Sequence, residues 1–316
     1  MIALHALPLV AQVLLPIVLL AWQARGRSRS CATALAKTLF IAAYLVAIAL
    51  VGLWLIVPWF LSVVYLVVLA VVTVPVTRAM RSRSLALWPE NRRGRLGLVV
   101  GGTVAIAAVG LVCYALAGRQ PPSGPIVDLA FPLRHGTYAV ANGGSNELVS
   151  AHMQTLSAER FRSFRGQSYG VDIIQLSAFG LRASGLAPRD PSAYAIFGET
   201  IYAPCGGTVL RVEDGFADMS PPDADRQHMA GNYVFLDCKG VRVLLGHMQR
   251  GSVRVQSGHS IAEGDVIGQV GNSGNTSEPH LHIHAQRPAE NDALLSGEPL
   301  PIRLNGRFLT RNDRIR

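Results

Sequence analysis

Three histidines alternate with apolar residues near the C-terminal end of the chain. In the run EPHLHIHAQ, His280, His282 and His284 occupy every second position. Successive side chains of a strand point to opposite faces, so the imidazoles would share one face while Leu281 and Ile283 enter a core. Imidazole binds metals and titrates near neutral pH, so such a face could hold a metal or transfer protons. An edge strand that merely exposes histidines to solvent is the alternative interpretation.

Short strand-like runs precede and follow these histidines. They are separated by Gly, Pro and Asn, as is typical of turns between strands. One segment, NELVSAHMQTLSAERFRSF, fits either a helix or a loop. The runs are GTYAVANGG, YGVDIIQL, TIYAPCGGTVLRVEDG, GNYVFLDCKGVRVLLGHM, SIAEGDVIGQVGNSGN, PHLHIHAQ and RFLTRND. We therefore expect an all-β domain in the C-terminal part of the chain.

The N-terminal part is dominated by long uncharged stretches. The whole chain is 50% hydrophobic and only 16% charged, a balance that soluble domains rarely show. Residues 2–22, 38–77 and 96–118 contain no Asp, Glu, Lys or Arg. A spanning helix needs roughly 20 apolar residues, and the second stretch can hold two helices divided at Pro58. We expect four transmembrane helices, the first retained because it lacks the basic n-region and cleavage site of a signal peptide.

The net charge of +9 is confined to this N-terminal part. Residues 1–118 hold 10 of the 29 Lys and Arg but one of the 20 Asp and Glu, which leaves 19 of each for the remainder. The basic residues lie in two short loops, so they do not indicate a nucleic-acid surface. The positive-inside rule places both loops in the cytoplasm. We expect a multi-pass protein of the cytoplasmic (inner) membrane whose C-terminal domain lies on the periplasmic or extracellular side.

The four cysteines divide between the two parts. Cys31 and Cys113 lie in the membrane part, whereas Cys205 and Cys238 lie in strand-like runs of the C-terminal part. An exported compartment permits disulfides, and a cross-strand bond between the second pair is one outcome. The sequence does not fix the distance between their Cα atoms, so free thiols are the other.

Several motifs together resemble the lysostaphin and LytM-type zinc endopeptidases, which cut peptide cross-links in bacterial cell wall. The motifs are YGVDI, GETIYAPCGGTVL, LLGHM and GDVIGQVGNSGNTSEPHLHIH, in the order and spacing of that family, within residues 130–310. The resemblance implies antiparallel sheets of a duplicated hybrid motif, a Zn2+ ion and peptidoglycan peptides as substrate. We expect a membrane domain in residues 1–118, a linker in 119–129 and a LytM-like zinc metallopeptidase domain in 130–316.

The resemblance also implies roles for individual residues. By position, His282 and Asp172 correspond to zinc ligands, and His280 and His247 correspond to catalytic histidines. One position departs from the pattern, because the HxxxD motif that ends at Asp172 requires a histidine where this chain has Ser168. A neutral hydroxyl is a poor zinc ligand beside imidazole and carboxylate. The site is therefore either impaired or completed by another histidine.

His152 is the replacement ligand that we expect. The layout AHM followed by GQSYGVD resembles a branch of the family in which a histidine of the preceding segment replaces the HxxxD histidine. A packing or surface role for His152 is the first alternative, and the other candidate ligands are His135, His228, His259 and His284. His284 stands where the family usually has an acidic residue, which predicts a place beside the ligands or in solvent.

Two histidines and one aspartate suit a hydrolytic zinc. Three protein ligands leave a fourth position for water, whose pKa the metal lowers toward neutrality. Two further histidines can accept and donate the protons that peptide hydrolysis moves. In a strand, His280 and His282 would lie about 7 Å apart along the backbone, so one strand face could supply a base and a ligand.

Two hypotheses of different class follow. The first is a zinc metalloendopeptidase, held in the lipid bilayer by its N-terminal helices, that hydrolyses peptide bonds of peptidoglycan cross-links or stem peptides. The second is a catalytically inactive LytM-like regulator that binds cell wall or activates an amidase partner, and Ser168 motivates it. The sequence contains no HExxH, GxSxG or GxxxxGK motif that would favour another chemistry.

Overall fold

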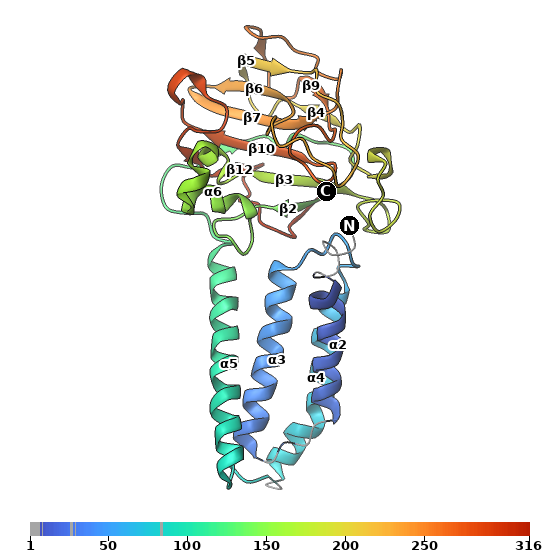
Figure 1. Ribbon diagram of the computed structural model, residues 1–316, viewed down its shortest axis with the longest axis vertical. Coiled ribbons are helices and arrows are strands. Elements are labelled where there is room, and N and C mark those ends of the chain that lie inside the picture. Colours follow the sequence, from blue (N-terminus) through green and yellow to red (C-terminus); the bar gives the residue numbers. More distant parts are fainter. Residues whose placement is uncertain (1–6, 8, 26–27, 29, 83–84) are drawn as a thin grey trace. The chain divides into compact units, whose positions relative to one another are not determined.

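Figure 1 shows the computed structural model of the chain. The structure describes residues 7, 9–25, 28, 30–82 and 85–316. By its internal contacts the chain divides into two compact units, residues 1–116 and 117–316. The first unit is helical and the second is built mainly of strands.

Apolar helices make up the first unit. A short π-helical segment, η1 (Val10–Leu14), continues into α2 (Leu15–Arg25), and three longer helices follow: α3 (Cys31–Val51), α4 (Leu61–Arg81) and α5 (Arg92–Ala117). The last three are long and apolar enough to cross a membrane, whereas Val10–Arg25 is shorter. Of the four expected spans, the described residues therefore contain three. Residues 2–6 of the first expected span lie outside the described residues.

Local sequence explains where α3 begins and how its neighbours pack. The Ser30 hydroxyl accepts the Thr33 backbone N–H while the Thr33 hydroxyl accepts the Ser30 N–H, and this capping box satisfies two backbone donors at the start of the helix. Polar side chains also lie within the apolar core of α2, α3 and α4, where the Gln23 amide donates to the Thr38 and Thr73 hydroxyls. Such bonds join helices where water is scarce.

A nine-stranded sheet organises the second unit, as the sequence predicted for an antiparallel β domain. Neighbouring strands are antiparallel, and β11 pairs with β10 beside the main path. In spatial order the path is β13 (Arg314–Ile315), β2 (Thr137–Asn142), β3 (Val171–Leu176), β10 (Leu281–Gln286), β7 (Val241–Met248), β6 (Asn232–Cys238), β5 (Gly207–Glu213) and β8 (Ser260–Ile261), with β11 at Pro299–Leu300.

Two small sheets flank the large one. β1 (Val127–Leu129) pairs in parallel with β12 (Ile302–Leu304), and β4 (Thr200–Tyr202) pairs with β9 (Val266–Gln269). β1 falls inside the range expected as a linker. The run RFLTRND, expected as strand-like, is instead an irregular connection between β12 and β13. Its backbone groups bond to Val140 of β2, to Gly143 and to one another.

The period of two in β10 has the predicted consequence. Leu281 and Ile283 are fully buried in the main core, which also contains Ile173 of β3 and Leu245 of β7. Burying side chains of this size stabilises the fold by roughly 1.5–3 kcal/mol each. A shift of one residue in the pairing of β10 would turn the imidazoles into the core and the apolar side chains out of it. The packing therefore fixes the register of β10.

Four strands place one residue each in a row across the sheet. Asn142 of β2 is opposite Asp172 of β3, Asp172 is opposite His282 of β10, and His282 is opposite Gly246 of β7. The register of β2 shifts between Val140 and Asn142, which is a β-bulge or similar irregularity. Strands far apart in the sequence thereby lie side by side in the sheet, in the order β2, β3, β10 and β7 (Figure 1).

Two further features complete the unit. The segment that fitted either a helix or a loop consists of short helical turns: η2 (Ala151–Met153), α6 (Gln154–Ser157) and η3 (Glu159–Gln167). Cys205 and Cys238 form a disulfide with their Cα atoms 5.9 Å apart, so the first of the two outcomes expected for this pair is observed. It ties the connection between β4 and β5 to the end of β6.

Candidate metal centre

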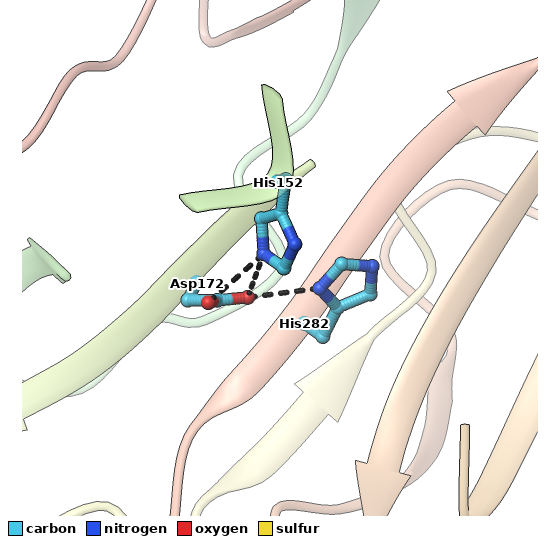
Figure 2. Close-up of side chains that lie close together, drawn as sticks. All are labelled: His152, Asp172 and His282. Carbon is cyan, nitrogen blue, oxygen red and sulfur yellow. Dashed lines mark hydrogen bonds and ion pairs between the residues drawn. The ribbon is translucent and has the colours of Figure 1, made fainter. Parts of the chain in front are cut away.

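His152, Asp172 and His282 meet on the sheet face, one from η2 and two from adjacent strands (Figure 2). Their potential ligand atoms all lie within 4.8 Å of one another. Nε2 of His152 is 3.0 Å from both carboxylate oxygens of Asp172, and Nδ1 of His282 is 2.8 Å from Oδ1. Two imidazoles and a carboxylate are a donor set that zinc accepts.

Ser168 does not take part in this cluster. It is fully buried, its hydroxyl donates to the Arg165 carbonyl oxygen at 2.6 Å, and it lies 2.9 Å from the Thr155 hydroxyl. The position where the resemblance requires a histidine thus holds a side chain engaged with its own loop. His152 reaches Asp172 from the opposite end of the same helical segment.

Gly170 leaves space for the His282 ring. A Cβ atom at this position would lie 2.7 Å from Cε1 of His282 and 2.9 Å from the Gln167 carbonyl oxygen. Real Cβ atoms essentially never show a contact under 3.0 Å. A side chain at residue 170 would therefore displace the imidazole or the turn that precedes β3.

The partners of His284 determine which nitrogen of His282 faces the cluster. His284 is fully buried, so the solvent-facing alternative for it was wrong. Its Nε2 lies 3.3 Å from the Leu294 carbonyl oxygen, which can only accept, so Nε2 carries the hydrogen. The His284 Nδ1 atom then accepts from Nε2–H of His282 at 3.0 Å. Nδ1 of His282 is left as a lone pair that faces the Asp172 carboxylate, and a cation between these two acceptors satisfies both.

Charge in the cluster favours an ionised Asp172. Burial alone would raise the pKa of this carboxyl group, but the charges of His152 and His280 and the hydrogen bond from His152 hold it well below its usual value. Burial lowers the pKa of His152, yet the charge and hydrogen bond of Asp172 outweigh it and the net direction is upward. Burial lowers the pKa of His282. A metal takes Asp172 as a carboxylate and both imidazoles as neutral rings, so it would replace the proton that Asp172 favours on His152.

His247 and His280 lie next to the cluster. Their ring centroids are 4.7 Å apart, and Nε2 of His280 is 3.6 Å from Oδ1 of Asp172. Each Nδ1 contacts a backbone carbonyl oxygen, His247 that of Ser273 at 2.8 Å and His280 that of Glu278 at 2.9 Å. Carbonyl oxygens only accept, so each Nδ1 carries the hydrogen and each neutral ring keeps a free lone pair on Nε2.

His247 has two further distinguishing properties. Burial and the neighbouring charges of His280 and His282 hold its pKa well below the usual value, so the ring is neutral near pH 7. Its φ of 61° is a left-handed backbone conformation, stabilised where its N–H donates to the Ala230 carbonyl oxygen at 2.9 Å. At this irregular position near the end of β7, the imidazole lies toward the cluster, with its ring centroid 5.9 Å from that of His282.

The other histidines that the sequence offered lie apart from the cluster. His135, His228 and His259 are exposed, and His228 bonds to Asp225 and stacks on Phe216 with ring centroids 4.0 Å apart. Sequence reasoning missed a different kind of residue. Asn142 bonds to the Asp172 carboxylate and Arg311 bonds to Asn142. The sequence signal was weak, because Asn142 is simply one residue of the strand-like run GTYAVANGG.

The fold and the cluster define a class, an antiparallel β domain in which two histidines and an aspartate could hold a metal ion. The model of peptidase family M23 matches residues 193–294. The C-terminal part of this chain is accordingly a lysostaphin-like M23 peptidase domain, and it follows N-terminal apolar helices. The match includes His247, His280 and His282 and begins downstream of His152 and Asp172.

Known proteins resemble parts of the chain. Endolysin 2638A of Staphylococcus phage 2638A is 37% identical over 68 residues, which are 21% of this chain and 14% of the endolysin. Lysostaphin from Staphylococcus simulans is 19% identical over 41% of each chain, with a TM-score of 0.27. Pseudoalterin, an M23 metalloprotease from the deep sea, is 14% identical over 60% of this chain and 99% of its own, with a TM-score of 0.34. This chain thus spans less than half of lysostaphin and a small part of the endolysin.

Proposed function

We propose that this protein is a membrane-anchored zinc metalloendopeptidase that hydrolyses peptide bonds in peptidoglycan cross-links or stem peptides. The observation that carries the proposal is the convergence of His152, Asp172 and His282 in a chain with an M23 domain. These three residues are the proposed zinc ligands, and His247 and His280 are the proposed catalytic residues. A three-ligand set leaves room for water and substrate, as in other catalytic zinc sites.

The roles of the two catalytic histidines follow from their hydrogen bonds. Zinc, when bound, supplies a Lewis acid for the peptide carbonyl and lowers the pKa of the attacking water. His247 is neutral and its Nε2 is free to accept a proton, because its Nδ1–H donates to a backbone carbonyl oxygen. The proton that His247 accepts can then pass from its Nε2 to the leaving amine. His280 brings a second imidazole 4.7 Å away, which could stabilise negative charge on the carbonyl oxygen when its Nε2 carries a proton.

The positions of the basic loops support an extracytoplasmic β domain. One loop precedes α3 and the other joins α4 to α5. Two spans, α3 and α4, separate the loops, so both loops lie on the same side of a membrane and α5 leads to the other side. The positive-inside rule assigns the side of the loops to the cytoplasm. The Cys205–Cys238 disulfide is a bond that persists in exported compartments. In this proposal residues 1–118 are the membrane domain and 130–316 the peptidase domain.

The test compares zinc and activity in the full chain, purified in detergent micelles. We expect the wild type to hold one zinc ion per chain and to release peptide fragments from peptidoglycan, detected by mass spectrometry. His152→Ala should lose both, because it removes a proposed ligand. His259→Ala is the matched control, since His259 is exposed and outside the cluster, and it should retain both.

The inactive regulator predicts a different outcome of the same experiment. A folded wild type that binds no zinc and cuts no wall from several types of bacteria would contradict the peptidase. Binding of that protein to cell wall, or stimulation of a cell-wall amidase, would then establish the regulatory function.

A further inference from the structure

One asparagine contacts both parts of the metal centre that the chain must bring together. Asn142 lies directly opposite Asp172 after the register shift in β2. Bulges next to active sites often serve to redirect a side chain. Here the Asn142 Nδ2 atom donates to Oδ2 of Asp172 at 2.9 Å. The bond engages one carboxylate oxygen and leaves Oδ1, the oxygen nearest His282, on the side of the cluster.

The other end of the same amide holds the segment that carries His152. The Asn142 Oδ1 atom accepts the backbone N–H of Ala151 at 3.2 Å. Ala151 is the first residue of η2 and directly precedes His152. A single side chain thus bonds to the Asp172 carboxylate and to the backbone next to the His152 imidazole, two groups that are 20 positions apart in the sequence.

Arg311 determines which end of the amide faces Asp172. Its guanidinium donates to the Asn142 Oδ1 atom at 2.7 Å and to the carbonyl oxygens of Ala141 and Leu148 at 3.0 and 3.2 Å. A guanidinium cannot accept a hydrogen bond, so the amide oxygen must face Arg311 and the amide nitrogen must face Asp172. The same three bonds join both ends of the loop that leads from β2 toward His152.

We propose that Asn142, oriented by Arg311, is the positioning residue that makes His152 a metal ligand in place of residue 168. In an HxxxD pattern the short spacing itself keeps histidine and aspartate together. A ligand from a separate segment has no such restraint, and ordering its backbone costs conformational entropy. Asn142 and Arg311 supply the missing restraint through fixed hydrogen bonds. This inference rests on the proposed metal centre.

The experiment measures metal affinity in the full chain in micelles, by competition with a chromogenic chelator for zinc. Asn142→Ala removes both bonds and should weaken zinc binding about 10–100-fold, the usual effect of losing a partner that orients a ligand. Asn142→Asp keeps the volume and an oxygen for Arg311 but replaces the N–H donor with an oxygen that faces Asp172. Asn142→Asp should weaken zinc binding at least as much as Asn142→Ala does.

Gln175→Ala is the matched control. Gln175 lies on the same strand as Asp172, and its amide donates to the His135 carbonyl oxygen at 2.8 Å without contacting the cluster. Its zinc affinity should equal that of the wild type. The absorption spectrum of the cobalt-substituted protein is the second measurement, because it reports ligand geometry, and it should change in both Asn142 variants but not in Gln175→Ala.

The outcomes separate this inference from the proposed function. A folded wild-type protein that binds no zinc would contradict the proposed metal centre itself. Zinc in the wild type, with unchanged affinity and spectrum in folded Asn142→Asp, would overturn only the role of Asn142. Loss of affinity in Asn142→Ala with wild-type affinity in Asn142→Asp would show that packing, not hydrogen bonding, is what the side chain provides, and would also overturn it.

Discussion

Four histidines of the site divide into two sides by the kind of partner they have. On the β3 side, His152 and His282 contact the Asp172 carboxylate. On the β7 side, His247 and His280 each direct Nδ1 to a backbone carbonyl oxygen. A carboxylate adds negative charge and draws a cation, whereas a carbonyl oxygen fixes the ring without adding a charge. The same residue type thus suits metal binding on one side and proton transfer on the other.

The pKa shifts of His152 and His247 express this difference. Asp172 outweighs burial and raises the pKa of His152, while burial and neighbouring charges hold the pKa of His247 well below its usual value. Burial is common to both rings, so it does not distinguish them. The decisive difference is the distance of each ring from one carboxylate.

The largest effect should come from removing that carboxylate. Asp172→Ala takes away a ligand and the counter-charge of two buried histidines, so zinc binding and hydrolysis should both be lost. Zinc content and release of wall peptides measure this. Asp128→Ala, at an exposed position on β1, should behave as wild type. Zinc retained in Asp172→Ala would remove the basis for treating the β3 side as a metal site.

The next largest effect should be confined to catalysis. His247→Asn and His280→Ala should each lower kcat about 10²–10⁴-fold, the usual contribution of a general acid or base, with zinc content unchanged. Asn is chosen at position 247 because it tolerates the left-handed backbone there. If either variant lost zinc as well, that histidine would belong with the ligands and the division into two sides would fail.

A smaller effect should appear in the pH dependence of stability of the metal-free protein. Above the unfolded pKa of 6.5, folded His152 keeps a proton that the unfolded chain releases, so its stabilisation falls as pH rises through its raised folded pKa. Between the depressed pKa of His247 and 6.5, the unfolded chain binds the extra proton instead, so stability rises with pH. Each slope is at most about 1.4 kcal/mol per pH unit.

Two variants test these opposite signs. His152→Gln should flatten the decline above pH 6.5, and His247→Gln should flatten the rise below it. Both slopes are measured by urea unfolding in the presence of chelator, with hydrogen exchange of the β10 amides as the readout. Slopes that change in the same direction would show that burial alone, and not the carboxylate, governs the two rings.

The smallest effect should follow Ser168→Ala. The hydroxyl donates to the Arg165 carbonyl oxygen and touches no residue of the cluster. Its loss should cost about 1 kcal/mol of stability, the value of one hydrogen bond, and leave zinc affinity unchanged. A drop in zinc affinity would instead return residue 168 to the metal centre.

Much of the β domain was predictable because its signals are local. The alternation in HLHIH assigns Leu281 and Ile283 to the core and the histidines to the opposite face, and the structure has this arrangement. The layout of its segment predicted His152 as a ligand, because residue 168 is a serine and the site would need a histidine from elsewhere. The structure places His152 next to Asp172, with Nε2 3.0 Å from the carboxylate. Its role as a metal ligand stays a prediction.

The remaining parts depend on distant partners. Asn142 faces Asp172 only because β2 changes register, and Arg311 bonds to it across 169 positions of sequence. No local pattern in the sequence predicts the register shift of β2 or the contact with Arg311. The count of spans failed for another reason, because a stretch without charges shows that a segment is apolar but not how long its helix is.

The disulfide has a practical consequence for anyone who produces this protein. Cys205 and Cys238 are joined, and Cys31 and Cys113 are free thiols. Correctly oxidised material should therefore show two reactive thiols after denaturation, whereas protein accumulated in a reducing cytosol should show four. A simple thiol titration before each assay would separate batches that carry the cross-link from those that lack it.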